Sequence, residues 1–180
     1  MKKEDGETPL FSQSNPDVVK LLIKRGADVN IENDYKRTAL FKNKNPDIVK
    51  ILIENGADVN HKDSYNQTPI FSVDNYEIIK LLIENGADLN YTTHNGHTPI
   101  FGLEDINILK LLIDNGADIN HITNSGENVL FEISDQNTIK FLIDNGVDVN
   151  KKNNHGETAL SIHEEDPEIR KILIDAGAKE

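Results

Sequence analysis

Residues 81–90 read Leu81-Leu82-Ile83-Glu84-Asn85-Gly86-Ala87-Asp88-Leu89-Asn90, and close copies of this decapeptide recur throughout the chain. The copies end at Asn30, Asn60, Asn120 and Asn150, and a shortened sixth copy ends at Ala178. A triplet of the Thr-Pro-Leu type precedes each copy at a thirty-residue period, and the triplets begin at Thr8, Thr38, Thr68, Thr98, Asn128 and Thr158. Such self-similarity predicts a stacked array of six small units, each burying its apolar face against its neighbours.

The third block shows what one unit contains. Residues 63–67 are rich in Asp, Ser and Asn, which favour turns. Thr68 is expected to cap a short helix that Pro69 opens, because proline is tolerated at the first helical position. Asn75 then caps a second helix, which ends at Asn85-Gly86 because glycine readily adopts the left-handed conformation.

The second helix of this block carries a wide apolar stripe. Apolar residues between 78 and 83 recur at helical spacing, while Lys80 and Glu84 lie on the predicted solvent side. Leu82 is therefore expected in the core. Val73, Leu103 and Ile133 share one short-helix position, where core packing between blocks is favoured over a groove lining.

The triplet, the two-helix unit and the Leu-Leu-Ile-x-x-Gly-Ala-Asp-Val-Asn ending together resemble the ankyrin repeat over residues 6–178. This resemblance implies an all-α solenoid of stacked helix–turn–helix units with β-turn fingers and a concave groove. It also implies one domain over 1–180, with repeats at about 4–33, 34–63, 64–93, 94–123, 124–153 and 154–180. Members of this family bind other proteins and carry no chemistry of their own.

Two departures from the family pattern affect the unit. The usual ankyrin period is about 33 residues, so the thirty-residue period indicates a trimmed first helix or connecting turn. The histidine that often follows the triplet is replaced by phenylalanine, which exchanges a polar link for aromatic packing. The phenylalanines are Phe11, Phe41, Phe71, Phe101 and Phe131.

Composition limits the partners. The net charge of -12 should repel nucleic acid phosphates and anionic membranes, and it favours a partner with a basic surface. The chain has no cysteine, which excludes disulfides and thiol chemistry. Residues 1–6 have no apolar core of the kind found in secretion signals, and no run approaches membrane-spanning length. We therefore expect a cytoplasmic monomer without a cofactor.

The predicted finger tips vary between blocks while the frame does not, which favours recognition over plain solvated loops. Tyr35, Tyr65 and Tyr91 are the expected aromatic anchors. Lys36, Arg37, Lys42 and Lys44 form a local basic island that suits an acidic element, although scattered surface charge explains it equally well. The candidate protein-binding residues are Asp34, Tyr35, Lys36, Arg37, Lys44, Ser64, Tyr65, Gln67, Tyr91, His94, Asn95, His97, Asn124 and Ser125.

We expect neither a metal site nor catalytic residues. His61 and His121 lie two blocks apart, and blocks stack at about 8–10 Å, so the two cannot share an ion. The recurrent aspartates at Asp28, Asp58, Asp88, Asp118 and Asp148 occupy one slot, which is typical of turn bonding. No glycine-rich phosphate loop or nucleophile elbow is present.

The two ends of the array differ. The last block is rich in charged residues from Glu164 onward, as a capping repeat requires. The first block has only a short charged leader and the polar segment 12–14. Three explanations stay open there: a modest cap, residues lost upstream, or contact with another molecule.

Two functional readings follow. The first is a noncatalytic protein-interaction module that uses its fingers and concave face. The second is a dedicated inhibitor, such as an immunity protein that masks a basic toxin or nuclease, since the negative charge would accelerate association with a cationic partner. An enzyme with an unfamiliar site in the groove is a weaker third reading.

Overall fold

The computed structural model describes residues 5–179, and the α-helix is their main regular element. Within that range no strand forms, and one isolated β-bridge joins Lys152 to Thr158. The expected all-α class is confirmed. The chain divides into two compact units, Met1–Tyr91 (unit 1) and Thr92–Glu180 (unit 2).

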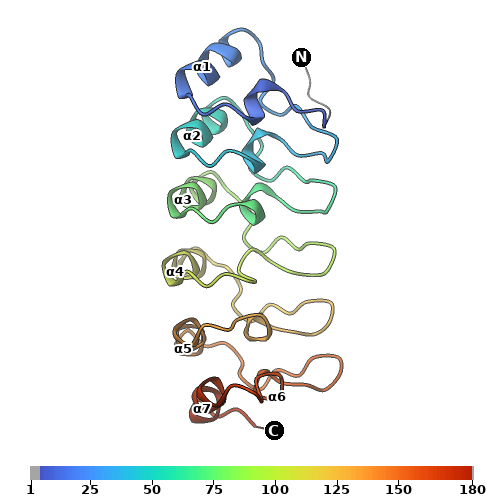
Figure 1. Cartoon of the computed structure of the whole chain (residues 1–180), viewed down its shortest axis with the longest axis vertical. Coiled ribbons are helices and arrows are strands. Elements are labelled where there is room, and N and C mark those ends of the chain that lie inside the picture. Colours follow the sequence, from blue (N-terminus) through green and yellow to red (C-terminus); the bar gives the residue numbers. More distant parts are fainter. Residues whose placement is uncertain (1–4, 180) are drawn as a thin grey trace. The chain divides into compact units, whose positions relative to one another are not determined.

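Unit 1 holds three repeats, each built from one 3-10 turn, one nine-residue α-helix and one finger loop. In Figure 1 its α-helices lie on one side and its finger loops on the other. Helix α2 packs against both α1 and α3. The elements are η1 (Pro9–Phe11), α1 (Pro16–Lys24), η2 (Ala39–Phe41), α2 (Pro46–Glu54), η3 (Pro69–Ser72) and α3 (Tyr76–Glu84).

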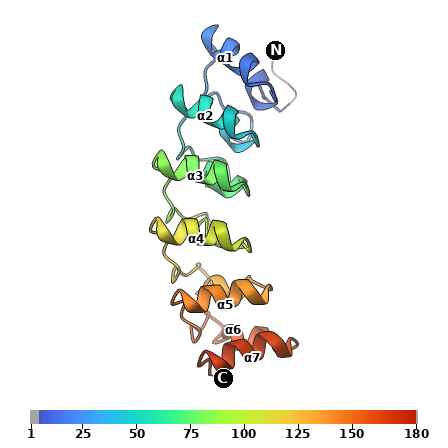
Figure 2. The same ribbon diagram turned by 90° about the vertical axis from the view of Figure 1, so that its left-hand side faces the viewer.

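Unit 2 repeats this plan with two local differences. In its first repeat a plain turn replaces the short helix, and Gly102 adopts a positive φ of 71° there. In its last repeat the short helix is α-helical and packs against α7, which is labelled at the C-terminal end in Figure 2. The elements are α4 (Ile106–Asp114), η4 (Val129–Phe131), α5 (Gln136–Asp144), α6 (Ala159–Ile162) and α7 (Pro167–Asp175).

The nine-residue helices begin where the sequence predicts. Asn75 accepts a hydrogen bond from the backbone N–H of Ile78, and Asn or Asp caps the other five α-helices of this length in the same way. These caps satisfy N–H groups that have no partner within the helix. Gly86 follows α3 with φ of 84°, as expected for a helix end.

The capping role predicted for Thr68 is wrong. Its side chain makes no cap bond, and its hydroxyl is buried without a hydrogen-bond partner among the described residues, as are those of Thr8, Thr38 and Thr98. The first helix is only a 3-10 turn, in which the N–H of Phe71 already donates to the backbone oxygen of Thr68. Thr158 precedes the α-helical α6 and does cap it, in a reciprocal bond pair with Ser161.

The core consists of the predicted stripes. Leu82 is fully buried, as are its counterparts Leu52, Leu112 and Leu142. The row of Val73, Leu103 and Ile133 is divided: Ile133 is buried, whereas Val73 and Leu103 are half-buried. The expectation of core packing holds fully for Ile133 only.

Asparagines at the ends of the decapeptides join neighbouring repeats within each unit. The Asn60 amide donates to the backbone oxygen of Gly86 at 2.8 Å and accepts from the N–H of Asp88 at 2.9 Å. Asn120 makes the equivalent pair in unit 2, to Gly146 and Asp148. Asp88 in turn accepts from the N–H of Asn90, so the recurrent aspartate is a turn-bonding residue, as the sequence predicts.

Candidate protein-binding surface

A buried Asn or Asp closes the base of the two fingers at residues 31–37 and 61–67 in unit 1. Asn33 accepts from the N–H groups of Tyr35 and Arg37 at 3.0 Å, and its own N–H donates to the backbone oxygen of Arg37 at 2.9 Å. Asp63 does the same in the next finger. The tips then turn through positive φ angles of 57° at Lys36 and 58° at Asn66. Side chains between the base and these turns are thereby directed away from the core.

Within each unit, backbone hydrogen bonds join adjacent fingers. In unit 1 the N–H of Ser64 donates to the backbone oxygen of Tyr35 at 2.9 Å. In unit 2 the N–H of Asn124 donates to Asn95 at 3.1 Å, and that of Asn154 donates to Ser125 at 2.8 Å. The tip residues of neighbouring repeats are therefore held in fixed register, which lowers the entropy lost on docking.

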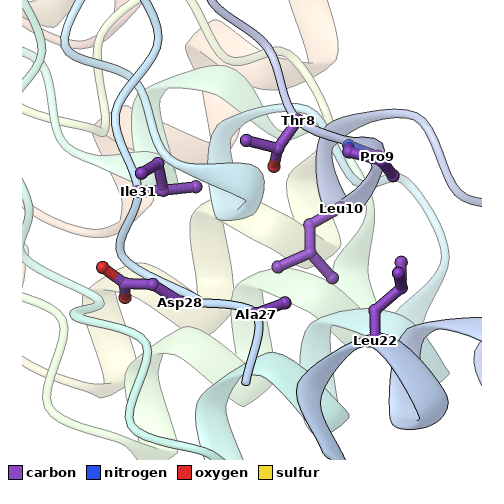
Figure 3. A pocket seen from close by; sticks show the side chains of 7 residues that line it. All are labelled: Thr8, Pro9, Leu10, Leu22, Ala27, Asp28 and Ile31. Carbon is purple, nitrogen blue, oxygen red and sulfur yellow. The ribbon is translucent and has the colours of Figure 1, made fainter. Parts of the chain in front are cut away.

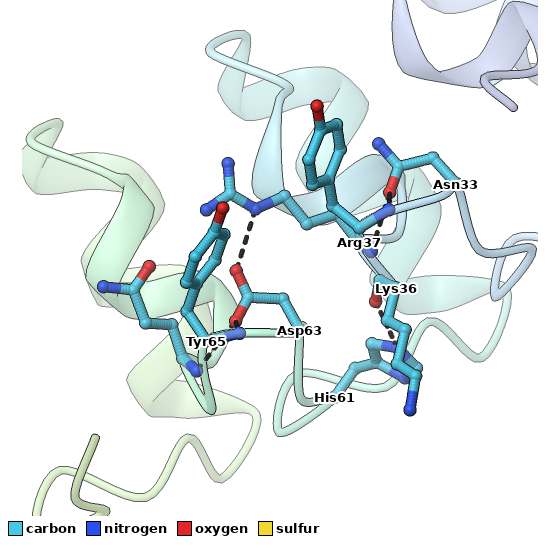
Figure 4. A network of polar contacts seen from close by, with 8 residues as sticks. Asn33, Lys36, Arg37, His61, Asp63 and Tyr65 are labelled. Carbon is cyan, nitrogen blue, oxygen red and sulfur yellow. Dashed lines mark hydrogen bonds and ion pairs between the residues drawn. The ribbon is translucent and has the colours of Figure 1, made fainter. Parts of the chain in front are cut away.

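The tips of unit 1 present an aromatic and cationic cluster (Figure 4). Tyr35 and Tyr65 are 52% and 55% exposed. The Arg37 guanidinium lies 5.8 Å from the ring centroid of Phe41 and 5.9 Å from that of Tyr65. Its Nε donates to the buried carboxylate of Asp63 at 2.8 Å. Arg37 is thus fixed between two rings, in the geometry of cation–π contacts.

Tyr91 lies elsewhere on its finger. It is half-buried, its hydroxyl donates to the Asn66 side chain at 2.6 Å, and the Lys62 ammonium lies 4.6 Å from its ring centroid. The structure therefore brings two of the three predicted anchors to finger tips and binds the third to the preceding finger. The repeat register contains the signal, because Tyr91 aligns with His61 and not with Tyr65.

The basic island is smaller than the sequence suggests. Arg37 pairs with Asp63, and Lys42 pairs with the buried carboxylate of Glu7. Lys36 and Lys44 are exposed and form no ion pair within residues 5–179. Of the four basic residues in this island, Lys36 and Lys44 are therefore the two that are available to an acidic element.

The candidates of unit 2 are more polar and are bonded to one another. His94, Asn95, Asn124 and Ser125 are exposed at the tips, and the Asn124 amide donates to the backbone oxygen of His94 at 2.9 Å. His97 Nε2 lies 2.5 Å from the Glu132 carboxylate of the next repeat. In unit 1, Asp34 and Ser64 are exposed, and Gln67 is half-buried at the base of its finger.

The histidines bridge repeats. His61 Nε2 lies 2.8 Å from the backbone oxygen of Lys36, and His121 Nε2 lies 2.8 Å from that of Gly96. Each ring meets a phenylalanine edge-on, Phe41 at 6.3 Å and Phe101 at 6.1 Å between centroids. Sequence reasoning missed these pairs, although the alternation of histidine at this register was visible. Among residues 5–179 no group of three or more His, Asp or Glu could hold a metal ion.

Repeated helix pairs with bonded fingers define a helical-repeat protein of the ankyrin type. The model for "Ankyrin repeats (3 copies)" matches residues 1–63, 41–102 and 100–180, and the chain belongs to the ankyrin-repeat family. No curated protein sequence matches the chain. None of the described helices is long and apolar enough to cross a membrane.

Solved structures agree on the architecture. A crystal structure of an ankyrin repeat domain from Acinetobacter baumannii AYE is similar, with a TM-score of 0.77 and 26% identity, over 91% of this chain and 93% of that one. In all, 452 solved chains match. A likeness shared so widely identifies a fold that generally mediates protein–protein interactions, and it names no particular partner.

Proposed function

We propose that the chain is a noncatalytic protein-interaction module that grips a partner protein with its finger tips and the short-helix surface beside them. The observation that carries this proposal is the cluster of Tyr35, Tyr65 and Arg37. Tyr and Arg dominate the binding energy at protein interfaces. Arg37 is already ordered by the rings of Phe41 and Tyr65 and by the Asp63 carboxylate, so it loses little conformational entropy on binding. In unit 2 the polar tips His94, Asn95, Asn124 and Ser125 are proposed as further contact residues.

The remaining parts of the proposal follow from charge and local bonding. The partner presents a basic surface, because the chain has a net charge of -12. The chain itself is proposed to act as a cytoplasmic monomer. No catalytic residue is proposed, since aspartates such as Asp58 and Asp88 are engaged in turns. The exposed Lys36 and Lys44 bind an acidic element of the same partner.

The experiment is capture of a partner with the full chain, followed by affinity measurements on finger variants. Replacing Tyr35 and Tyr65 together by Ala should weaken binding by at least about 2 kcal/mol, as hot-spot residues do. Tyr76→Ala is the matched control, because Tyr76 is an exposed tyrosine at the start of α3, outside the fingers. Equal affinity of the double variant and the control would remove the fingers from the proposal.

A second candidate function rests on the uneven charge. Residues 92–180 contain 16 acidic and 7 basic residues, a formal charge of -9. Such a surface suits an inhibitor that masks a basic toxin or nuclease. Association with one such protein should then slow strongly as salt rises, whereas an adaptor that relies on the tyrosine tips should show weak salt dependence.

A further inference from the structure

The first repeat exposes an apolar face that the second repeat buries. Leu21 on α1 is 51% exposed, whereas its counterpart Ile51 on α2, which packs against α1, is 7% exposed. Leu22 is half-buried, whereas its counterpart Leu52 is fully buried. Within residues 5–179 nothing covers this face of α1, which we call the end face.

Beside Leu22 the end face is hollowed by about 100 Å³ (Figure 3). The walls are mainly apolar: Pro9, Leu10, Leu22, Ala27 and Ile31, with Thr8 and Asp28 as the polar members. An apolar cavity of about 150 Å³ can take a benzene ring, so this hollow matches one aliphatic side chain.

The polar members of the wall do not form a built polar site. The Asp28 carboxylate accepts from the N–H of Asn30 at 2.9 Å. The Thr8 hydroxyl has no partner, but the hydroxyls of Thr38, Thr68 and Thr98 share this condition in covered positions. The unpaired threonine hydroxyl is therefore a property of the repeat and not of the hollow. The occupant that fits the hollow is apolar.

Lys24 and Arg25, which we call the basic rim of the end face, lie about one helical turn after Leu21. At the positions of Lys24 and Arg25, the next four repeats have an acidic residue followed by asparagine. These pairs are Glu54-Asn55, Glu84-Asn85, Asp114-Asn115 and Asp144-Asn145. Lys24 and Arg25 are exposed and form no ion pair in the described part of the chain. In a protein of net charge -12, this basic rim beside an apolar hollow selects a partner with carboxylates.

We propose that the end face binds an acidic amphipathic helix of a partner protein. One aliphatic side chain fills the hollow beside Leu22, apolar neighbours cover Leu21, and carboxylates pair with Lys24 and Arg25. This surface shares no residue with the tyrosine tips and goes beyond the proposed function.

A second copy of the chain fits the end face less well. The last repeat has Arg170 where α1 has the buried Val19, and its outer turn carries an ion pair between Lys171 and Asp175. Although Ile162 and Ile174 are exposed in that repeat, its charged groups match the apolar hollow poorly.

The test uses the full chain and a fluorescein-labelled synthetic helical peptide with leucines along one face and glutamates beside them. A matched peptide with lysines in place of the glutamates is the comparison. Fluorescence anisotropy should show saturable binding of the glutamate peptide and at least about tenfold weaker binding of the lysine peptide.

Variants locate the binding. Lys24→Glu with Arg25→Glu, and separately Leu21→Gln, should each weaken the glutamate peptide about tenfold. Lys50→Glu combined with Lys80→Glu is the first control, because it makes the same charge change on exposed lysines of α2 and α3. Ile174→Gln is the second control, because Ile174 is 51% exposed, as Leu21 is. Both control variants should bind the glutamate peptide within about twofold of the parent chain.

Three results would overturn the proposal: no saturable binding, equal binding of the two peptides, or full affinity in the Lys24 and Arg25 variant. Sedimentation velocity without peptide adds a fourth. Self-association that Leu21→Gln abolishes would assign the end face to a second copy of this chain.

Discussion

Thr38 and Thr158 occupy the same position in two repeats, yet their hydroxyl groups have opposite surroundings. The Thr38 hydroxyl is buried without a partner, whereas that of Thr158 accepts from the N–H of Ser161. A buried, unpaired hydroxyl destabilises the fold because its desolvation is not compensated. The sequence predicts the same capping role for both, and the length of the helix that follows decides between them.

Replacing each threonine by valine tests this difference. Thr38→Val should leave the free energy of unfolding unchanged or raise it by up to about 1 kcal/mol, because no hydrogen bond is lost. Thr158→Val should lower it by about 1 kcal/mol through loss of the cap. Urea unfolding followed by circular dichroism measures both, and an equal loss in the two variants would contradict the assignment.

Ionisation of Asp135 makes the stability of the fold depend on pH. The backbone N–H of Thr138, and then its hydroxyl, hold the pKa of the Asp135 carboxyl below its ordinary value. A lowered folded-state pKa means that the ionised form stabilises the fold above the ordinary Asp pKa of about 3.9, and that this contribution is lost as pH falls through the lowered pKa.

An NMR titration of the Asp135 side-chain carbon should therefore show a pKa below that of an Asp in an unfolded peptide. Thr138→Ala should move the pKa upward, since the hydroxyl bond is lost, while Thr138→Ser retains a hydroxyl and should keep the pKa low. A midpoint that does not differ between the Ala and Ser variants would show that the hydroxyl has no part in the shift.

At the scale of the element, helix prediction succeeds because the apolar period and the caps agree. Asn75 and Gly86 delimit α3, and the stripe through Leu82 is buried. The short helices are less predictable, because a 3-10 turn depends on a few bonds, and the repeat that contains Gly102 forms a plain turn instead.

Leu82→Ala tests the packing of α3. Removing this fully buried side chain should lower the free energy of unfolding by about 2–5 kcal/mol, because a cavity forms between packed repeats. Glu84→Ala, on the exposed side of the same helix, is the control and should change it by less than about 0.5 kcal/mol. Chemical denaturation measures the free energy of unfolding of both variants. The affinity of the Leu82→Ala variant for a captured partner should fall only under conditions in which that variant is partly unfolded.

At the scale of the whole molecule, charge is distributed unevenly along the chain. Residues 11–50 contain 8 basic and 5 acidic residues, whereas residues 92–180 have a formal charge of -9. A cationic nitroxide should consequently relax the amide protons of residues 92–180 more than an anionic nitroxide does. The ratio of the relaxation rate with the cationic nitroxide to the rate with the anionic one should be smaller for residues 11–50. Raising the salt concentration should reduce the contrast, and a uniform ratio would refute the charge segregation.

The sequence alone determined the period, the limits of the nine-residue helices, the buried stripes and the ankyrin family, because each depends on local capping or on a pattern repeated six times. Tertiary structure decided which side chains are free. Tyr65 and Tyr91 are both finger tyrosines, yet only contacts with the preceding repeat bind Tyr91 to Asn66 and leave Tyr65 exposed. Arg37, Lys42 and the end face around Leu21 follow the same rule, since ion pairing and burial depend on the neighbouring repeat, which one repeat's own sequence does not specify.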